Sequence, residues 1–485
     1  MADLQDLLVP SGGQDNIVVD NNDTSTTSSC CTTSEEVPVP TSNVGSSMGA
    51  VVFNFTNSII GAGAIGLGGA IASSGGVVSV AAIIFFAVLT KVSLDMVIDL
   101  SIGSSYEELG RKCFGIAGWL AVLVSKMLYA FGCLVAYIVV VKDNLCSSLA
   151  HLLSISVNET ALMISLCTLV LLPLCLLRDM TPLSSLSLFS VASMGIIVAI
   201  VLGLYFDDPN GMREHGGSVD EHWFQVRSGL LPSLGTFVFS FVSQHTVHLA
   251  FESLRPELQT LENWKRISFL SIALATVVSL SVGVFVYMTF WEHTGSDLFV
   301  LYPALPIIDV AKLLLCMTMV LTFPFPFFTC RDMLIVGATL AFHRQRSEEA
   351  EERRVVQEDN DLEEPLLQQD AASHGSHPTP AVTSLPSWLI ADRQLEPRLH
   401  FLVTTTLWAV TTALALVAPN LGDVLNLVGC ATGTVIAFVL PSLFSFRLRG
   451  YSHTAMILLV VGGLVGGIGT FFSTKQLILD ATHAE

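Results

Sequence analysis

Charged side chains are scarce in this sequence. Lys, Arg, Asp and Glu make up only 13% of the 485 residues, whereas hydrophobic residues make up 52%. Soluble domains carry roughly 25% charged residues, so this shortage excludes a string of ordinary soluble domains. Basic residues are scarcer still, with 22 Lys and Arg against 41 Asp and Glu. Because no basic face is available to meet phosphates, a nucleic-acid partner is excluded.

The motifs of an enzyme or a metalloprotein are also missing. The ten cysteines form no CxxC pair and no Cys/His spacing typical of metal sites. No HExxH motif, paired catalytic carboxylates or Ser/His arrangement lies in an apolar run. We therefore expect no catalytic residue, no metal centre and no bound cofactor.

The two longest polar segments contain few hydrophobic residues. Residues 1–45 hold Asp and Glu but no Lys or Arg, so they do not resemble a signal peptide. We expect a disordered, acidic cytosolic tail over 1–45 and a disordered cytosolic linker over 343–396. The tail contains Asp3-Leu-Gln-Asp-Leu7-Leu8, an acidic dileucine pattern that sorting adaptors bind. This pattern places the endolysosomal or vacuolar membrane beside the plasma membrane as a predicted location.

Long apolar runs fill the rest of the chain. A hydrocarbon core of ~30 Å requires ~20 apolar helical residues. Lipid tolerates only helices and closed barrels, and the alternating pattern of a barrel strand is absent. The sequence therefore predicts an all-α polytopic membrane protein with eleven transmembrane helices, at about 48–74, 76–102, 116–141, 160–177, 182–206, 229–253, 267–291, 304–330, 399–418, 422–446 and 454–474.

The distribution of basic residues predicts the orientation of these spans. With a cytosolic N-terminus, fifteen Lys and Arg, Arg331 among them, fall in cytosolic loops and four fall outside. This bias agrees with the positive-inside rule for eleven spans and a C-terminus on the other side. Only Cys146 then lies in a non-cytosolic loop, so no loop disulfide is expected. The sequon at Asn158 lies in an outer loop beside a span, and both its modified and unmodified forms remain open.

Glycines interrupt the first apolar run at positions 61, 63, 66, 68 and 69. Each glycine weakens a helix interior by about 1 kcal/mol relative to alanine. A broken helix is tolerated at membrane depth only where it lines a cavity, and its free amides and carbonyls suit an anion and a cation. Close helix packing is the alternative, although these glycines do not share one helical face. We expect the break at Gly61 and Gly63, and a zwitterionic ligand beside it.

The segment Asn57-Ser-Ile-Ile-Gly61-Ala-Gly63-Ala-Ile-Gly66-Leu resembles the first-span signature of the amino acid/auxin permease family, especially its sodium-coupled neutral amino acid transporter branch. The resemblance implies a transmembrane amino acid transporter domain over 46–475. It also implies a leucine-transporter-like inverted 5+5 repeat, 46–206 and 229–446, plus one extra helix. The implied function is secondary active transport of neutral amino acids, coupled to Na⁺ or H⁺. A membrane nutrient sensor with weak transport is the alternative, suggested by the long tail and linker.

The resemblance also implies a set of site residues. Asn57 and Thr322, together with Gly61, match positions associated with Na⁺, because amide, hydroxyl and carbonyl oxygens suit a small cation. The alternative for Thr322 is a hydroxyl that bonds back to its own helix. The implied substrate contacts are Ser58, Gly61, Ala62, Gly63, Ser243, Gln244 and His245.

Polar side chains in other runs carry three further expectations. Ser243-Gln-His245 is costly in lipid, so the sixth span is expected to break there and face a cavity, with His248 on the same helical side as His245. Interhelical hydrogen bonds are the alternative for both histidines. Lys91 and Asp95 are spaced to form an ion pair. Lys126 and Lys312 lack an evident partner within their own spans and are expected to snorkel or to line water.

Overall fold

The computed structural model describes residues 45–102, 104–154, 158–177, 186–208, 211, 219–338, 397–418 and 420–483. The predicted linker, the dileucine motif and the tail up to residue 44 lie outside these residues. Within the described part, helices dominate, and the only β-pairing is a single parallel bridge between Ser46 and Leu254. The all-α prediction is confirmed.

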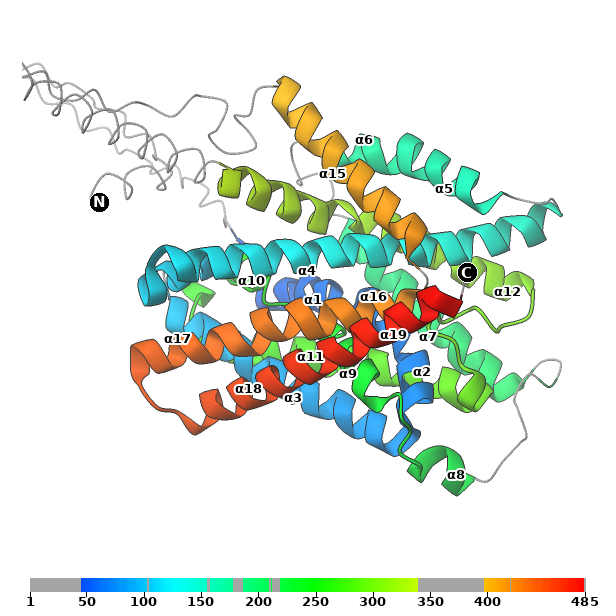
Figure 1. Ribbon diagram of the computed structural model, residues 1–485, viewed down its shortest axis with the longest axis horizontal. Coiled ribbons are helices and arrows are strands. Elements are labelled where there is room, and N and C mark those ends of the chain that lie inside the picture. Colours follow the sequence, from blue (N-terminus) through cyan, green and yellow to red (C-terminus); the bar gives the residue numbers. More distant parts are fainter. Residues whose placement is uncertain are drawn as a thin grey trace, which may run out of the picture. The chain divides into compact units, whose positions relative to one another are not determined.

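Helices follow one another along the described parts of the chain (Figure 1). They are α1 Met48–Ile59, α2 Ala62–Ser74, α3 Gly76–Ser101, α4 Tyr106–Leu153, α5 Glu159–Leu166, η1 Cys167–Leu171, α6 Leu172–Cys175, α7 Leu186–Asp207, α8 Val219–Phe224, α9 Leu230–Phe239, α10 Val247–Glu252, η3 Pro256–Leu258, α11 Leu261–Phe290, η4 Trp291–His293, α12 Pro306–Thr322, a helix over 324–338, α15 Pro397–Val417, α16 Leu421–Val428, η6 Gly429–Gly433, η7 Val435–Val439, α17 Leu440–Arg449, α18 His453–Leu464, η8 Val465–Gly469 and α19 Thr470–His483.

Eight helices in the described residues are long and apolar enough to cross a membrane, or nine when the bent pair α1–α2 is one span. Two further predicted spans coincide with shorter apolar helices, Glu159–Cys175 and Leu230–Phe239. A polytopic membrane protein is therefore confirmed, whereas the count of eleven spans stays a prediction.

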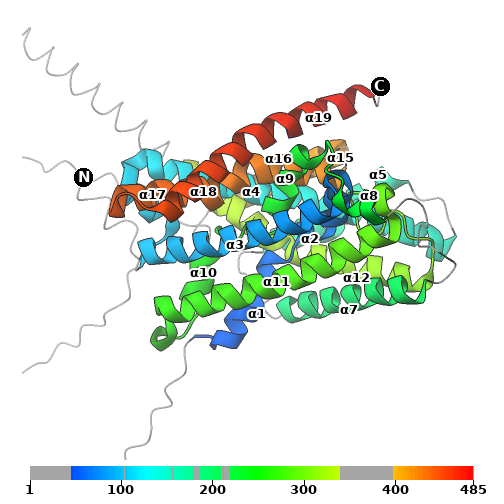
Figure 2. The ribbon, with the colours of Figure 1, turned by 90° about the horizontal axis from the view of Figure 1, so that it is seen from below.

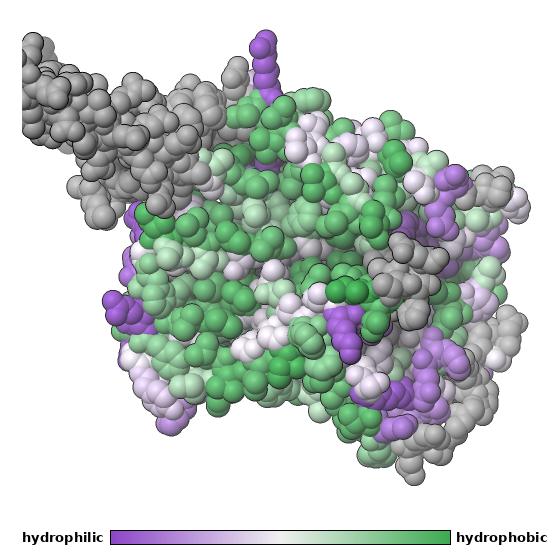
Figure 3. Space-filling view, viewed as in Figure 1, coloured by the Kyte–Doolittle hydropathy of each residue, from purple (hydrophilic) through white to green (hydrophobic). Residues whose placement is uncertain are grey.

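Apolar side chains cover most of the face of the helix bundle seen in Figure 3. On α3, for example, Ile84, Phe85 and Val88 are all about half exposed. On a water-soluble protein, a continuous exposed apolar surface of this kind would mark an interaction surface. Here they run along the helices, and hydrophilic residues gather toward the helix ends in this view, as a bilayer requires.

The core surrounds α2, α9 and α11. Helix α11 lies between α3 and α7 and also packs against α1 and α2 (Figure 2). Helix α9 packs against α2 and α16, where Thr236 donates from its backbone nitrogen and its hydroxyl to Oδ1 of Asn426, at 3.1 and 2.7 Å. Helices α2 and α9 therefore lie side by side inside the bundle.

Helix α4 corrects two of the sequence predictions. It extends to Leu153, so Cys146 is a buried helical residue and not part of a loop. It also bends at Phe114–Gly115, where Gly115 has a φ of +64° that favours glycine. The bend returns Glu107 to Lys126, and their side chains pair at 2.5 Å. Lys126 therefore pairs with a residue outside its predicted span rather than snorkelling or lining water.

Other charged side chains also find partners through the fold. The predicted pair between Lys91 and Asp95 is confirmed at 2.6 Å, while Asp99 pairs with Arg449. Lys312 donates to the Ser147 hydroxyl at 3.0 Å, so it too has a protein partner. Arg331, assigned above to a loop, is fully buried. It donates to the carbonyl oxygens of Cys175 at 2.7 Å and Leu177 at 3.2 Å, because those helix-end carbonyls lack partners of their own.

Candidate functional site

The first span is broken at Ile60–Gly61. Helix α1 ends at Ile59, α2 begins at Ala62, and their axes differ by 50°. The predicted break is confirmed, but only Gly61 lies in it. Gly63 belongs to the first turn of α2, where a Cβ atom would lie 2.6 Å from Cα of Ser240. Gly61 therefore lies in the helix break, while Gly63 allows close packing of α2 against α9. The helix break and close helix packing, the two explanations offered for the glycines, thus apply at different positions.

The break leaves backbone groups without helical partners. The amides of Ala62 and Gly63 and the carbonyls of Asn57 and Ser58 have no i, i+4 partner, as at any helix end, whereas the Gly61 N–H donates to the Ile59 carbonyl at 3.0 Å. The amides at the start of α2 present partial positive charge, and the carbonyls at the end of α1 present partial negative charge. Because α2 is buried from Ala62 onward, these charges act away from water and keep their strength.

The sixth span is also broken, as predicted. Helix α9 ends at Phe239 and α10 begins at Val247, with non-helical residues between them. The Tyr129 hydroxyl lies 3.3 Å from the carbonyl oxygen of Phe239 and 3.1 Å from that of Val242, to which it donates. This tyrosine satisfies carbonyls that the end of α9 leaves free, and so it holds the break in shape.

The two breaks touch at two points. The Gly63–Ser240 contact joins α2 to the end of α9, and the hydroxyls of Ser58 and Thr246 lie 3.3 Å apart. The fold thus brings together Ser58, Gly61 and Gly63 of the first span with the sixth-span segment that follows Phe239.

Gln244 holds the second break from inside. Its Oε1 accepts from the backbone nitrogen of Ser243 at 3.1 Å, and its Nε2 donates to the Ser93 hydroxyl at 3.2 Å. Ser243 and Gln244 are both fully buried. These two bonds hold the break in position and leave the Gln244 amide one further N–H and one oxygen lone pair.

Ser243 and His245 differ from Gln244, because each has a buried polar atom without a hydrogen-bond partner. These atoms are Oγ of Ser243 and Nδ1 of His245. Buried polar groups are nearly always satisfied, so orphan atoms beside a helix break indicate a place for a polar ligand.

His245 and His248 do not share a helical side, which corrects the prediction. His245 lies in the turn before α10, and its ring centroid is 5.1 Å from that of Tyr129. His248 lies within α10, where Nε2 is 2.7 Å from the Ser101 hydroxyl. The helical spacing fails because the helix begins only at Val247. The interhelical hydrogen bond offered as an alternative holds for His248.

The predicted cation ligands lie at two helix ends. Asn57 is half-buried, two residues before the end of α1. Thr322 is the last residue of α12, and its hydroxyl donates to the Thr318 carbonyl at 2.7 Å. No hydrogen bond in the described residues joins Asn57 to Thr322. A donating hydroxyl retains its lone pairs, so this bond leaves Thr322 able to accept or to ligate.

Prolines free a carbonyl beside the Thr322 hydroxyl. The helix that contains α12 is irregular at Phe323, just before Pro324 and Pro326. A proline has no N–H to donate to the carbonyl four residues earlier, so Pro326 leaves the Thr322 carbonyl without its helical donor. Thr322 therefore offers two oxygens, one from the side chain and one from the backbone.

Tyr137 of α4 is a site residue that the sequence reading missed. Its hydroxyl lies 3.2 Å from the position that a Cβ atom on Gly61 would occupy. The side chain is buried, and no hydrogen bond joins its hydroxyl to another described residue. Two tyrosine hydroxyls in a mostly apolar span, at Tyr129 and Tyr137, were the available signal.

Tyr137→Phe is expected to raise the substrate concentration for half-maximal uptake by about five- to tenfold, since one hydrogen bond contributes about 1 kcal/mol. The measurement is initial uptake rate against substrate concentration in proteoliposomes. Tyr451→Phe, on an exposed loop, is the control and should match the wild type. An unchanged half-saturation value for Tyr137→Phe would exclude contact between this hydroxyl and the substrate.

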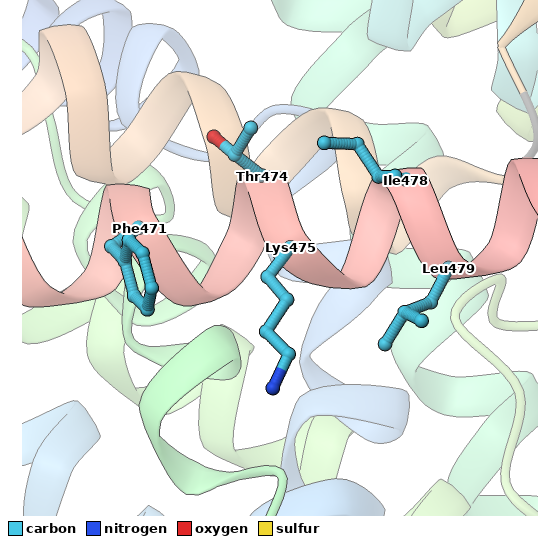
Figure 4. Close-up of a pocket in the computed structure, with 5 residues that line it drawn as sticks. All are labelled: Phe471, Thr474, Lys475, Ile478 and Leu479. Carbon is cyan, nitrogen blue, oxygen red and sulfur yellow. The ribbon is translucent and has the colours of Figure 1, made fainter.

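A separate open pocket of about 310 Å³ lies along α19 (Figure 4). Its lining residues are Phe471, Thr474, Lys475, Ile478 and Leu479. Helix α19 packs against α9, α16 and η8, and none of the predicted site residues lines this pocket. The candidate site is therefore the pair of breaks and not the α19 pocket.

Known proteins resemble this chain along most of its length. A family described as transmembrane amino acid transporter protein matches residues 44–478. The putative sodium-coupled neutral amino acid transporter 11 of Bos taurus is 24% identical over 451 residues, covering 90% of this chain and 85% of that relative. Its counterpart from Danio rerio is 24% identical over 440 residues, covering 87% and 85%.

A solved structure shares the fold. Mhp1, a nucleobase-cation-symport-1 family transporter in a closed conformation with bromovinylhydantoin bound, matches with a TM-score of 0.52 and 12% identity, over 90% of this chain and 93% of that chain. This likeness supports the leucine-transporter-like fold class. The family match and the relatives confirm the predicted resemblance to the amino acid/auxin permeases and their sodium-coupled neutral amino acid transporter branch. The chain belongs to the transmembrane amino acid transporter protein family.

Proposed function

We propose that this protein is a secondary active transporter that carries neutral amino acids across a membrane together with Na⁺ or H⁺. The observation that carries this proposal is the meeting of two broken spans inside the bundle, at Gly63–Ser240 and Ser58–Thr246. Interrupted helices at membrane depth place bare backbone groups where a zwitterion and a cation bind. The names of the relatives point to the same cargo and the same ion.

The proposed substrate site uses both breaks. The backbone amides of Ala62 and Gly63, and that of Gly61 once it releases the Ile59 carbonyl, would hold the carboxylate of the amino acid, since they lie at the positive end of α2. The orphan atoms of Ser243 and His245, together with the Ser58 hydroxyl, would meet its polar groups. Gln244 holds the sixth-span break and still has one N–H and one oxygen lone pair with which it would meet the substrate.

The proposed Na⁺ site takes oxygen ligands from Asn57, the Gly61 carbonyl and Thr322. This set is uncharged, as suits a monovalent ion held beside a negatively charged carboxylate. Binding of the ion and of the substrate would favour each other, because each supplies charge that the other lacks.

Alternating access requires the two ends of the pathway to open in turn. On the predicted cytosolic side, α1 and α10 are joined by the Ser58–Thr246 contact. The backbone nitrogen of Ser46 also donates to the Ser253 carbonyl at 2.7 Å, and that of Arg255 donates to the Ser46 carbonyl at 3.2 Å. These few bonds are what release to the cytosol would have to break. On the other side, α2 must part from α9.

Two finer proposals concern the location of the protein. Sorting adaptors would bind the acidic dileucine motif of the tail, and the protein would reside in the plasma membrane or in an endolysosomal or vacuolar membrane.

A membrane nutrient sensor with weak transport is the second candidate function.

Uptake of radiolabelled neutral amino acids into proteoliposomes tests the proposal, with Na⁺ and pH gradients imposed separately. We expect accumulation that one of the two gradients stimulates and that collapses when the gradient is dissipated. Saturable binding of amino acids without flux would instead support the sensor. Absence of both binding and flux for every neutral amino acid would refute the proposal.

A further inference from the structure

The tenth span, predicted over 422–446, is irregular along its middle. After α16, the chain winds as the π-helical segments η6 and η7 before α17 begins at Leu440. The Leu440 N–H donates to the carbonyl oxygen of Val435, five residues earlier, and not to that of Ile436. Segments of this kind are rare and occur often at functional sites, so we asked what holds η7 in place.

Pro441 deprives two carbonyl groups of η7 of a helical donor, because a proline has no N–H. The Ala437 carbonyl would take an α-helical bond from residue 441, and the Ile436 carbonyl would take a π-helical bond from it. The other helical donor for Ile436 is Leu440, whose N–H is already bonded to Val435. Ile436 and Ala437 are both fully buried, so donors from other helices are favoured over unpaired carbonyls.

Two hydroxyl groups from other helices supply these donors. The Tyr106 hydroxyl of α4 donates to the Ile436 carbonyl at 2.8 Å. The Ser93 hydroxyl of α3 donates to the Ala437 carbonyl. A carbonyl oxygen can only accept, so the single proton of each hydroxyl is committed to its carbonyl. Toward any further partner, Ser93 can therefore act only as an acceptor.

The further partner of Ser93 is Gln244, in the sixth-span break. Nε2 of Gln244 donates to the Ser93 oxygen at 3.2 Å, and Oε1 of Gln244 accepts from the Ser243 N–H at 3.1 Å. Because the Ser93 proton is committed to Ala437, only the nitrogen end of the Gln244 amide can bond to Ser93. A carbonyl of the tenth span thus fixes the direction of the whole chain of hydrogen bonds, from Gln244 through Ser93 to Ala437.

Tyr106 makes a second link between the sixth and tenth spans. Its ring stacks on that of His248 in α10, with the ring centroids 6.0 Å apart and the planes 20° from parallel. Nε2 of His248 also lies 2.7 Å from the Ser101 hydroxyl of α3. The sixth span therefore contacts both residues that donate to η7, one at its break and one at α10.

We propose that Ser93 is a positioning residue, through which the tenth span sets the orientation of the Gln244 amide in the sixth-span break. Ser93 holds the amide nitrogen toward α3, so that the remaining N–H and oxygen lone pair of Gln244 are presented in one fixed arrangement. The hydrogen-bond chain is a property of the fold, whereas its effect on a substrate rests on the proposed transport function. Ser93 acts through Gln244 and needs no contact of its own with the substrate.

Hydrogen exchange of the backbone amides, in the purified full-length protein without substrate, tests the hydrogen-bond chain. Ser93→Ala removes both bonds of the hydroxyl. After correction for intrinsic rates, we expect exchange about fivefold faster over 240–247 and over 442–446, as the loss of one ordinary hydrogen bond implies. Gln244→Ala should speed exchange only over 240–247, because Ser93 can still donate to Ala437.

Ser79→Ala is the matched control for the exchange experiment. Ser79 is also a fully buried serine of α3, and its hydroxyl donates to the Gly75 carbonyl of its own helix at 2.6 Å. Both segments should therefore exchange as in the wild type. Should Ser93→Ala fail to fold, Ser93→Cys keeps nearly the same size with a weaker donor, and it should speed exchange in both segments by a smaller factor.

Uptake measures the effect on the substrate. Ser93→Ala should raise the substrate concentration for half-maximal uptake about fivefold in the wild-type background. In the Gln244→Ala background the same change should raise it less than twofold, because the residue through which Ser93 acts is gone. A serine that only stabilises the fold would give equal factors in the two backgrounds.

Wild-type exchange over 240–247 in the Ser93 variants, or equal factors in the two uptake backgrounds, would overturn the proposal. Because exchange is measured without substrate, the two experiments separate the two claims. Absence of uptake in every variant, with the expected exchange pattern, would refute the transport function and leave the role of Ser93 in the break intact.

Discussion

Gly63→Val is expected to reduce uptake by about 100-fold while the protein still folds and inserts. A Cβ atom at this position meets the backbone of Ser240, 2.6 Å from Cα and 3.0 Å from the nitrogen. A backbone atom inside a packed bundle has no rotamer to change, so α2 must move away from the end of α9. A displacement near 1 Å at a binding site costs about 100-fold in rate. Initial uptake rate per amount of protein in proteoliposomes measures the effect.

Gly203→Val supplies the matched control for this prediction. Gly203 lies in α7, and a Cβ atom there meets nothing within 4 Å. The same substitution should therefore leave uptake within about twofold of the wild type, since it changes only helix propensity, by under ~1 kcal/mol. Equal uptake by Gly63→Val and Gly203→Val would show that the contact between the two breaks does not matter for transport.

Asn57→Ala and Thr322→Ala are each expected to abolish most of the cation stimulation of uptake. Each removes one hard oxygen ligand, and an interaction with a charged group contributes about 1.5–3 kcal/mol. The Na⁺ concentration for half-maximal stimulation should therefore rise at least tenfold. The measurement is uptake at fixed substrate across a Na⁺ series, with protein content held equal.

Control substitutions at two nearby residues distinguish the loss of a Na⁺ ligand from the loss of a hydrogen bond within the helix. Thr329 bonds back to Phe325 at 3.1 Å in the same way as Thr322 bonds to Thr318, and Asn54 is an exposed amide on α1. Thr329→Ala and Asn54→Ala should keep the wild-type Na⁺ dependence. If Thr322→Ala behaves like Thr329→Ala, the hydroxyl only bonds its own helix and the assignment of a cation ligand falls.

Local features of the chain could be predicted from the sequence. Five glycines within nine residues predict a weak helix wherever they fold, because the entropy cost of glycine belongs to the residue itself. Ser243-Gln-His245 predicts an irregular segment for a similar reason, since such groups are costly in lipid. The Lys91–Asp95 pair depends on one helical turn alone and was equally accessible.

Contacts between segments far apart in the chain could not be predicted from the sequence. The sequence reading treated Gly61 and Gly63 as equivalent, yet one lies in the break and the other touches Ser240, which follows it by 177 positions. The ion pair between Lys126 and Glu107 forms only because α4 bends at Gly115. The position of Tyr137 beside Gly61 depends on how α4 packs on α2, and no local sequence pattern predicts that packing.

By itself, then, the sequence determined that the chain is a helical membrane protein whose first and sixth spans break, because hydropathy and helix propensity act over a few residues. The tertiary structure alone decided which side chains surround those breaks. Such pairings depend on the packing of helices far apart in sequence, where close approach of backbones selects the partners.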